Sequence, residues 1–411
     1  MTQTLERTTT HDDTVTEPVF TTTRATLADA LATVGVAIVG RPSVPVLAGV
    51  LLRAHGSDLM VCGFDYDTAI TVRIPDAVTT PGTLLVRHRE LSKLVSALTK
   101  GMTKKRADAS TVTLAGRDPA FATLTLADHT MPLERLPLED YPQLPASPQV
   151  FARMEGDRFL SQVRRVMPAV GRDDVLPMLT GVKVDPSDTG LIIAGSDRYR
   201  LAVGHVEATL TNDAPAVLLN GFMLRKILPK LTGTGTLTLG HGIDQWGIDL
   251  IELETGPVSI LTRQHNDGES FVKGTEYPKY FPTEVATTVT IDRQVLISHT
   301  EKATEVMKAT DRDSLPIVLT VGQDTVRMAP RLGEGDHYVS TPDIPATVDG
   351  QTHDVIGLNP RYTLDALATF TGSTVTLHIQ SPTKPVVLTD AGEKFDDPTT
   401  YRHLLMPLRL T

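Results

Sequence analysis

The stretch PVLAGVLL (45–52) has two counterparts further along the chain, PMLTGVKV (177–184) and PIVLTV (316–321). Each begins with proline and continues as a short apolar run, which indicates a buried strand that follows a turn. The three stretches recur at intervals of roughly 135 residues, a period that is typical of whole domains and too long for solenoid repeats. We therefore predict that the chain of 411 residues contains three related domains.

Three further markers recur in a fixed order around these strands. Segments with apolar residues at helical spacing come first: TLADALATVGVAI (26–38), RFLSQVRRVMPAV (158–170) and QVLISHTEKATEVM (294–307). A second set of helical segments follows each strand: LSKLVSAL (91–98), LRKILPKL (224–231) and LDALATF (364–370). A Tyr-Pro segment occurs twice, as EDYPQLP (139–145) and TEYPKYFP (275–282). Four markers in one order are not expected by chance.

The repeat defines the predicted domain organisation. We expect domains at 18–146, 147–286 and 287–411, with the Tyr-Pro segments closing the first two because proline suits a boundary. Alternating runs such as ATLTLADH (122–129) predict half-buried strands, so each domain should be α+β with about two helices and a majority of strand. Residues 1–17 are rich in threonine and acids, and we expect a disordered extension there.

Composition narrows the classes of protein. The net charge of −10 argues against a generally basic nucleic-acid binder, but one basic surface on an acidic body stays possible. Cys62 is the only cysteine, so an internal disulfide and a cysteine-rich zinc site are excluded, and Cys62 itself is expected in the core. We find no secretory signal and no apolar run of about 18 residues, and we expect a cytoplasmic protein with no membrane association.

Basic residues gather on the helical segments. The region 85–106 carries seven of them against Glu90, and the helical segments of the second domain carry further arginines and lysines. Equivalent helices of repeated domains should share one surface, so these bases could line a concavity that accepts a polyanion. The alternative is that they form ordinary solvated helix faces. No zinc-finger spacing or aromatic stacking motif accompanies them, so any contact should be made to phosphates.

Catalytic motifs are missing from the sequence. We find no H-E-x-x-H, G-x-S-x-G, Walker A or G-x-G-x-x-G pattern. The densest polar cluster is GSDRYRLAV (195–203), which could be an Asp–Arg pair at a strand end, a catalytic site or the rim of a binding groove. The equivalent stretch of the first domain is FDYDTAI (64–70), which has aspartates instead. A site built on only one repeat would show this difference.

The chain closes on YRHLLMPLRLT (401–411), which is unusually apolar for a terminus. Such a segment should either pack against another part of the protein or contribute to a binding surface. Met406 can adapt to different partners, and Pro407 fixes the local backbone.

Together, GRPSVPVLAGVLL, LPMLTGVKV, SDRYRLAV, LNPRYTLDAL, SPTKPVVLTD and HLLMPLRL resemble the bacterial sliding clamp family, the beta subunit of DNA polymerase III. The resemblance runs from about Phe20 to the end of the chain. It implies three DNA-clamp domains and a head-to-tail homodimer, a six-domain ring with helices inside and sheets outside. It also implies a non-enzymatic processivity factor without cofactor or metal.

The resemblance also implies site residues and partners. Duplex DNA would be encircled without sequence preference, next to Arg41, Arg89, Lys93, Arg172, Arg225 and Lys226. Replicative polymerase, clamp loader and repair proteins would dock through short motifs with Gln, Leu and Phe anchors. Their pocket would consist of Leu179, Ser196, Arg198, Tyr199, Arg200, Leu201, Pro278, Leu404, Met406, Pro407, Leu408 and Arg409.

Two alternatives to a replication clamp stay open. Ser196 stands where the family commonly has threonine, and the stretch APRLGEGDHYVS (329–340) matches its repeat partners weakly, which leaves room for a divergent paralogue that binds clamp partners or clamp-directed inhibitors. An enzyme that uses SDRYR and the tail for a small substrate is the other alternative, but the sequence nominates no nucleophile, base or metal for it.

Overall fold

The computed structural model describes residues 17–271, 276–333 and 336–410. By internal contacts the chain divides into two compact units. The first unit consists of residues up to 145 together with 257–261, and the second consists of 146–256 and 262–411. The segment 1–16 of the expected extension lies outside the described residues, whereas Glu17 is described and its carboxylate lies 3.2 Å from Nη1 of Arg135.

Domain I, in the first unit, alternates strands with three helices. Its helices are α1 (Arg24–Val34), α2 (His88–Ala97) and α3 (Lys104–Ala109). Its strands are β1 (Val19–Thr23), β2 (Gly49–His55), β3 (Asp58–Phe64), β4 (Thr68–Ile74), β5 (Val78–Thr80), β6 (Thr83–Arg87), β7 (Thr111–Gly116), β8 (Phe121–Leu126) and β9 (His129–Glu134).

Domain II follows the same plan. Its helices are α4 (Gly156–Val166) and α5 (Gly221–Ile227). Its strands are β10 (Gln149–Glu155), β11 (Gly181–Ser187), β12 (Gly190–Ser196), β13 (Arg200–Leu210), β14 (Val217–Asn220), β15 (Thr236–Ile243), β16 (Asp249–Thr255) and β17 (Val258–Arg263). Strand β17 pairs with β4, which is why residues 257–261 are grouped with the first unit.

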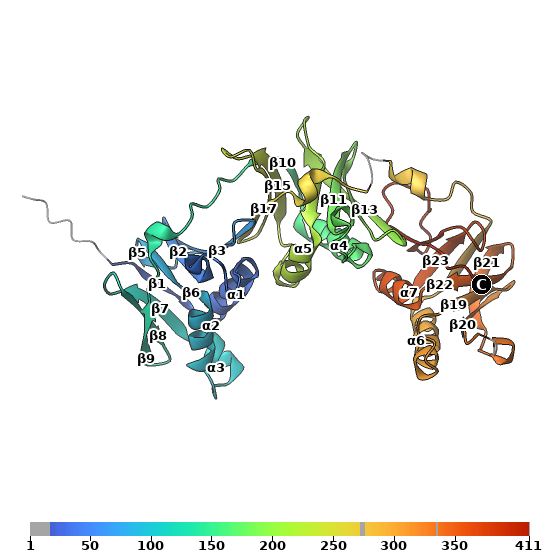
Figure 1. The fold of residues 1–411 in the computed structure, drawn as a ribbon, viewed down its shortest axis with the longest axis horizontal. Coiled ribbons are helices and arrows are strands. Elements are labelled where there is room, and N and C mark those ends of the chain that lie inside the picture. The colour runs from blue at the N-terminus through green and yellow to red at the C-terminus, as the bar shows by residue number, and fades with distance from the viewer. Residues whose placement is uncertain (1–16, 272–275, 334–335, 411) are drawn as a thin grey trace, which may run out of the picture. The chain divides into compact units, whose positions relative to one another are not determined.

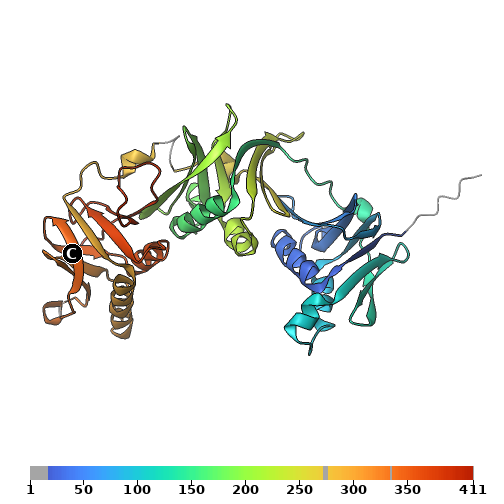
Figure 2. The ribbon, with the colours of Figure 1, turned by 180° about the vertical axis from the view of Figure 1, so that it is seen from behind.

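Domain III repeats the plan once more. Its helices are α6 (Arg293–Ala309) and α7 (Pro360–Leu367). Its strands are β18 (Thr287–Asp292), β19 (Ile317–Val321), β20 (Thr325–Pro330), β21 (Ile344–Gly350), β22 (His353–Leu358), β23 (Thr374–Ile379), β24 (Val386–Asp390) and β25 (Arg402–Leu405). Within each domain, taken by itself, the helices lie on one side of the strands (Figures 1 and 2).

Strand register confirms the predicted repeat. The three marker stretches lead into β2, β11 and β19, the first two through a 3₁₀ turn, and each of these strands pairs antiparallel with the strand that precedes the second helix. In domain I Gly49 lies opposite Arg87, and in domain II Gly181 lies opposite Asn220. The first strand of each domain likewise pairs with the strand after the second helix, as β1–β7, β10–β15 and β18–β23. The predicted α+β class is therefore confirmed.

Helix starts and ends follow local chemistry. Side-chain oxygens of Asn220, Asp292 and Asn359 accept backbone N–H groups at the starts of α5, α6 and α7, which satisfies donors that a first turn leaves free. In domain I the basic region 85–106, which the sequence suggested as one helical segment, contains two helices, α2 and α3. Helix α2 ends at Ala97, and Gly101, with a φ of 87°, lies in the turn before α3. Glycine adopts this left-handed conformation without the steric cost of a side chain.

The apolar tail packs as a strand between two domains of the second unit. Strand β25 pairs antiparallel with β13 of domain II and with β24 of domain III. Leu404 is buried in a cluster with Leu201, Tyr277 and Phe281. The side chain of Tyr401 stacks under the guanidinium of Arg165, 3.8 Å from ring centre to Cζ. The first part of the tail is therefore core, and a chain that lacked it would lose a shared strand.

Burial of histidines on these strands should make the second unit sensitive to acid. His403 on β25 and His378 on β23 are buried, and burial lowers their pKa values to about 3 and about 4. Below pH 6.5 the unfolded chain takes up protons that the folded chain does not, so stability is lost as the pH falls towards 4. At pH 5 we expect each histidine to lower the free energy of unfolding by about 2 kcal/mol.

Urea unfolding followed by circular dichroism between pH 7.5 and 5 measures this effect. His403→Gln should flatten the pH dependence, as should His378→Gln, whereas His129→Gln at an exposed position should leave it as in the parent protein. An unchanged pH slope in both buried variants would show that these histidines are not the source of acid sensitivity.

Candidate functional site

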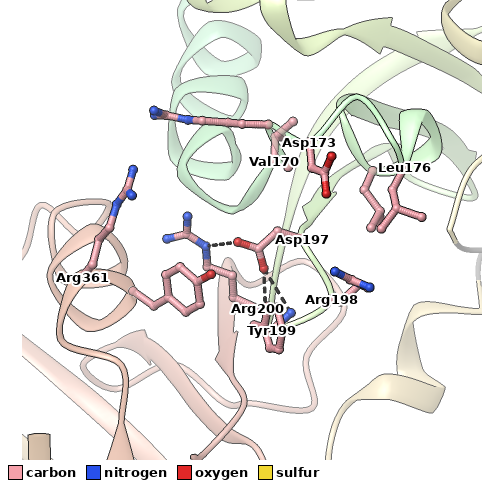
Figure 3. Close-up of a pocket in the computed structure, with 12 residues that line it drawn as sticks. Val170, Asp173, Leu176, Asp197, Arg198, Tyr199, Arg200 and Arg361 are labelled. Atoms are coloured by element: carbon pink, nitrogen blue, oxygen red, sulfur yellow. Dashed lines mark hydrogen bonds and ion pairs between the residues drawn. The ribbon is translucent and has the colours of Figure 1, made fainter. Parts of the chain in front are cut away.

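A cavity of about 380 Å³ lies at the junction of domains II and III, within the second unit. Three segments form its walls: the stretch that follows the short 3₁₀ turn at Met167–Ala169, the turn between β12 and β13, and the start of α7. The lining residues are Val170, Gly171, Arg172, Asp173, Leu176, Leu179, Asp197, Arg198, Tyr199, Arg200, Arg361 and Tyr362. Figure 3 shows this cavity in close-up.

Asp197 holds the turn between β12 and β13. Its Oδ1 accepts the backbone N–H groups of Tyr199 and Arg200, each at 3.1 Å, and Ser196 Oγ accepts the N–H of Arg198 at 3.2 Å. Arg198 has a φ of 81°, a left-handed conformation that residues with a side chain rarely adopt. The turn therefore presents Arg198 and Tyr199 outward at the cost of a strained residue.

Arg200 forms the floor of the cavity and joins the two domains. Its side chain is buried, with Nε 2.8 Å from Oδ2 of Asp197 and Nη1 2.7 Å from Oδ2 of Asp365 on α7. The guanidinium also stacks over the ring of Tyr362 at 4.2 Å. Both acidic partners and the aromatic face compensate the cost of burying this charge.

Two tyrosines and the tail form the outer part of the site. The rings of Tyr199 and Tyr362 stack with their centres 6.3 Å apart, and partial burial raises the pKa of Tyr362. Tyr199 is 48% exposed and Met406 is 39% exposed. The backbone N–H of Met406 donates to the carbonyl of Tyr199 at 2.8 Å, so the residue that follows β25 lies directly beside the β12–β13 turn.

The structure brings only part of the predicted pocket to the cavity wall. Leu179, Arg198, Tyr199 and Arg200 line it, and Ser196 and Met406 adjoin it through hydrogen bonds to the turn. Leu201 and Leu404 are buried opposite each other in the β13–β25 pairing, so they support the site from beneath. The other predicted residues lie further along the tail or on a separate 3₁₀ turn at Tyr277–Tyr280: Pro278, Pro407, Leu408 and Arg409.

Sequence reasoning missed several lining residues. Asp197 was visible in the SDRYR cluster but was not assigned to the pocket, and Arg361 and Tyr362 lie in the LNPRYTLDAL stretch. Asp365, the second partner of Arg200, is in the same stretch. That stretch carries the family resemblance and was the available signal. Nothing in its spacing, however, indicates that α7 lies against the β12–β13 turn.

The basic residues predicted for DNA have different surroundings. In domain I Arg41, Arg89 and Lys93 are exposed, and within the described residues no carboxylate lies at ion-pair distance from them. Lys93 also lines a hollow with Lys100 and Lys104. These side chains are exposed and could contact phosphates, and their contact with DNA stays a prediction.

The three candidates in domain II divide into two kinds. Lys226 is exposed on α5, and Arg172 is exposed at the rim of the cavity. Arg225 is half-buried instead, and its Nη2 donates to the carbonyl of Val170 at 2.7 Å. Burial lowers the pKa of its guanidinium. In this structure Arg225 therefore holds the backbone next to the cavity wall.

The described residues offer no metal site and no membrane span. No group of three or more His, Cys, Asp or Glu side chains among them is arranged to hold a metal ion. In the same part of the chain no helix is both long and apolar enough to cross a bilayer.

Comparison with known proteins gives one consistent result along the chain. Residues 19–145, 153–238 and 279–409 match the N-terminal, central and C-terminal domains of the DNA polymerase III beta subunit, in that order. The first two matches fall within the predicted domains 18–146 and 147–286, whereas the third begins at 279, before the predicted boundary at 287. The repeat seen in the sequence is thus the three-domain pattern of this family.

Individual relatives extend over nearly the whole length. The chain is 29% identical over 394 residues to the beta sliding clamp of Streptomyces coelicolor, which covers 94% of this chain and 98% of that protein. It is 27% identical over 395 residues to the beta sliding clamp homolog GriR of Streptomyces muensis, with 95% and 99% covered. The crystal structure of the Pseudomonas aeruginosa DnaN sliding clamp bound to griselimycin has a TM-score of 0.78 at 19% identity, over 96% of this chain and 100% of that one.

The position of Arg225 generates a test that separates support of the backbone from DNA contact. We expect Arg225→Ala to lower the free energy of unfolding by about 1–3 kcal/mol, because the buried carbonyl of Val170 loses its donor. Its neighbour Lys226→Ala should leave unfolding unchanged. Urea titration of both variants, followed by circular dichroism, gives the comparison, and equal midpoints for the two would contradict the structural role of Arg225.

Proposed function

The chain belongs to the DNA polymerase III beta subunit family, whose members are non-catalytic processivity factors, and on this premise we propose that it is a sliding clamp. In the proposal, two copies associate head to tail, and their six domains close a ring around duplex DNA. Helices face the DNA and sheets face solvent. The ring tethers a replicative polymerase and other partners through a peptide-binding pocket.

The observation that carries the proposal is the cavity between the β12–β13 turn and α7, with Tyr199 and Met406 exposed beside it. It is concave and small, and it combines apolar walls such as Leu176 and Leu179 with charged groups, as expected of a site for a short peptide. Two or three apolar anchors buried there would contribute roughly 1.5–3 kcal/mol each. After the cost of ordering the peptide, we expect dissociation constants on the order of micromolar.

The DNA part of the proposal is supported by exposed basic side chains on an acidic protein. Arg41, Arg89, Lys93 and Lys226 have no carboxylate at ion-pair distance among the described residues. Such charges attract phosphates without reading bases. Weak contacts suffice if a closed ring keeps the protein on DNA by topology.

A second candidate function is that of a divergent clamp paralogue, which binds clamp partners or clamp-directed inhibitors without serving replication. Two observations support it. The chain is nearly as similar to the clamp homolog GriR as to the Streptomyces coelicolor clamp, with 27% and 29% identity. The Pseudomonas aeruginosa sliding clamp, which shares the fold of this chain, has a crystal structure with griselimycin bound.

Peptide binding tests the pocket. We expect a fluorescein-labelled peptide with Gln, Leu and Phe anchors to bind the full chain with a micromolar dissociation constant in a fluorescence-anisotropy titration. A chain that lacks residues 406–411 should lose most of this affinity because Met406 is gone, while β25 ends at Leu405 and stays intact.

Thermal unfolding followed by circular dichroism serves as the control: the shortened chain should keep the folded spectrum of the full chain and melt at only a slightly lower temperature, because it loses the bridge between Leu408 and Gly357. A cut at Leu404 would be unsuitable, since it would remove half of the shared strand. Equal peptide affinity of the full and shortened chains would contradict a pocket built on the tail.

Loading onto DNA separates the two candidate functions. A replication clamp should be loaded by the cell's own clamp loader onto nicked circular DNA and should be released when that DNA is linearised, because only a closed ring is held by topology. Gel filtration of the labelled protein with the DNA measures this. Peptide binding without retention on circular DNA would favour the paralogue.

A further inference from the structure

The connection between the second helix and the next strand differs among the three domains. In domain I it covers 98–110 and contains α3, whereas it covers only 228–235 in domain II and only 368–373 in domain III. The strand that follows pairs with the first strand of its domain in all three cases, so the scaffold does not require the longer connection. The segment 98–110 is therefore an insertion specific to domain I, and such loop insertions often carry function.

Helix α3 is anchored to α1 through its C-terminal half. Ala107 is buried, and Oδ1 of Asp108 lies 2.7 Å from Nη1 of Arg24, the first residue of α1. The backbone N–H of Arg24 also donates to the carbonyl of Ser110 at 2.8 Å. Because a helix of six residues gains little from its own hydrogen bonds, these contacts hold α3 in place. The N-terminal half, which begins at Lys104, is exposed.

The insertion is strongly basic. Its basic residues are Lys100, Lys104, Lys105 and Arg106. The shorter connection in domain II has only Lys230, and that in domain III has no basic residue. All four side chains of the insertion are exposed, and in the described part of the chain no carboxylate lies at ion-pair distance from them. Asp108, the one acid of the insertion, is already paired with Arg24.

A side chain of α2 extends this basic surface. Lys93 lines one hollow together with Lys100 and Lys104, between α2 and α3. Helix α3 lies on the same side of the domain I strands as α1 and α2 (Figures 1 and 2). The insertion therefore enlarges the surface that already carries Lys93, on a protein whose net charge is −10. Uncompensated cations gathered at one place attract a polyanion within the range of a Debye length.

The composition of the insertion favours phosphates over a protein partner. Its larger apolar side chains, Leu98 and Met102, are half-buried, and it contains no aromatic residue. The centre of a protein–protein interface would need exposed apolar groups, and base stacking would need aromatic rings. Lysine ammonium groups on flexible stems contact backbone phosphates without reading sequence.

We propose that the insertion 98–110 is a phosphate-binding surface specific to domain I, where Lys104 and Lys105 contact the backbone of duplex DNA. The inference rests on the proposed function and names the domain that contributes most to the hold on DNA. Because the connections described for domains II and III contain no counterpart of α3, domain I should supply the larger share of salt-dependent binding. A ring of two chains would have one such surface in each chain.

The salt dependence of DNA binding measures these contacts. The full chain is titrated with a short fluorescein-labelled duplex between about 0.05 and 0.2 M salt, and the association constant is followed by anisotropy. We expect Lys104→Ala/Lys105→Ala to lower the slope of log K against log salt by about 2, because each lost phosphate contact removes about 0.9. The affinity at about 0.05 M salt should fall roughly tenfold.

Two further variants assign the effect to the charges of α3. Lys384→Ala/Lys394→Ala is the matched control, because it removes the same two charges from exposed positions in domain III, and it should keep the slope of the parent chain. Lys104→Arg/Lys105→Arg should also keep the slope, because both charges remain. Since all four positions are exposed, each variant should keep the thermal unfolding curve of the parent chain, measured by circular dichroism.

The outcomes separate this inference from the proposed function. Equal slopes in the two alanine variants would overturn the assignment to α3 and leave the proposed clamp standing. A larger loss of affinity for a single-stranded oligonucleotide than for the duplex would overturn duplex DNA as the ligand. If the parent chain does not bind the duplex, this inference fails, and retention on circular DNA then shows whether the proposed function fails with it.

Discussion

The pairing of β25 with both β13 and β24 is the constraint on which the second unit depends. Strand β25 has four residues and hydrogen-bonds to β13 of domain II on one side and to β24 of domain III on the other. Strands of the two domains are therefore joined into one sheet, and neither β13 nor β24 is left with an open edge at this place. Leu404 adds apolar contacts to Tyr277 and Phe281 beneath it. Because both domains supply walls of the pocket, the shape of the pocket depends on how firmly β25 holds the two domains together. Placing a site on paired strands and a helix gives it more rigidity than loops would.

Arginines at the junction of domains II and III have two roles, and the burial of each side chain decides which role it has. Arg165 and Arg200 are surrounded by acids and aromatic rings and connect the two domains, the first through Asp390 and the second through Asp365. Loss of Asp390 would leave the partly buried charge of Arg165 without its carboxylate partner, whereas Arg200 would keep Asp197 after the loss of Asp365. Arg198 and Arg361 stay exposed, which leaves their donors for a ligand. This acidic protein thus has a cationic rim at the junction of domains II and III, where Arg165 and Arg200 are paired with acids and Arg198 and Arg361 are exposed.

The repeat explains how a site can belong to a single domain. Asp65 and Asp197 make the same backbone hydrogen bonds in equivalent turns, so the turn is a property of the scaffold. In domain II, α7 of domain III lies against that turn, where Asp365 pairs with Arg200. A shared fold therefore does not give each copy the same function, because function depends on the groups grafted onto it.

The sequence by itself determined the three-fold repeat and the strand before each second helix, because these depend on local periodicity and apolar content, but it left open whether the apolar tail packs or binds. It also placed Arg198, Tyr199 and Met406 at one site through the family resemblance. Only the tertiary structure decided that Leu201 and Leu404 support the site from within, that Arg225 holds a carbonyl, and that Asp365 completes the partners of Arg200. Those roles depend on contacts between residues that are distant in sequence, within domain II for Arg225 and between domains II and III for Leu404 and Asp365, and the spacing of residues along the chain does not encode such contacts.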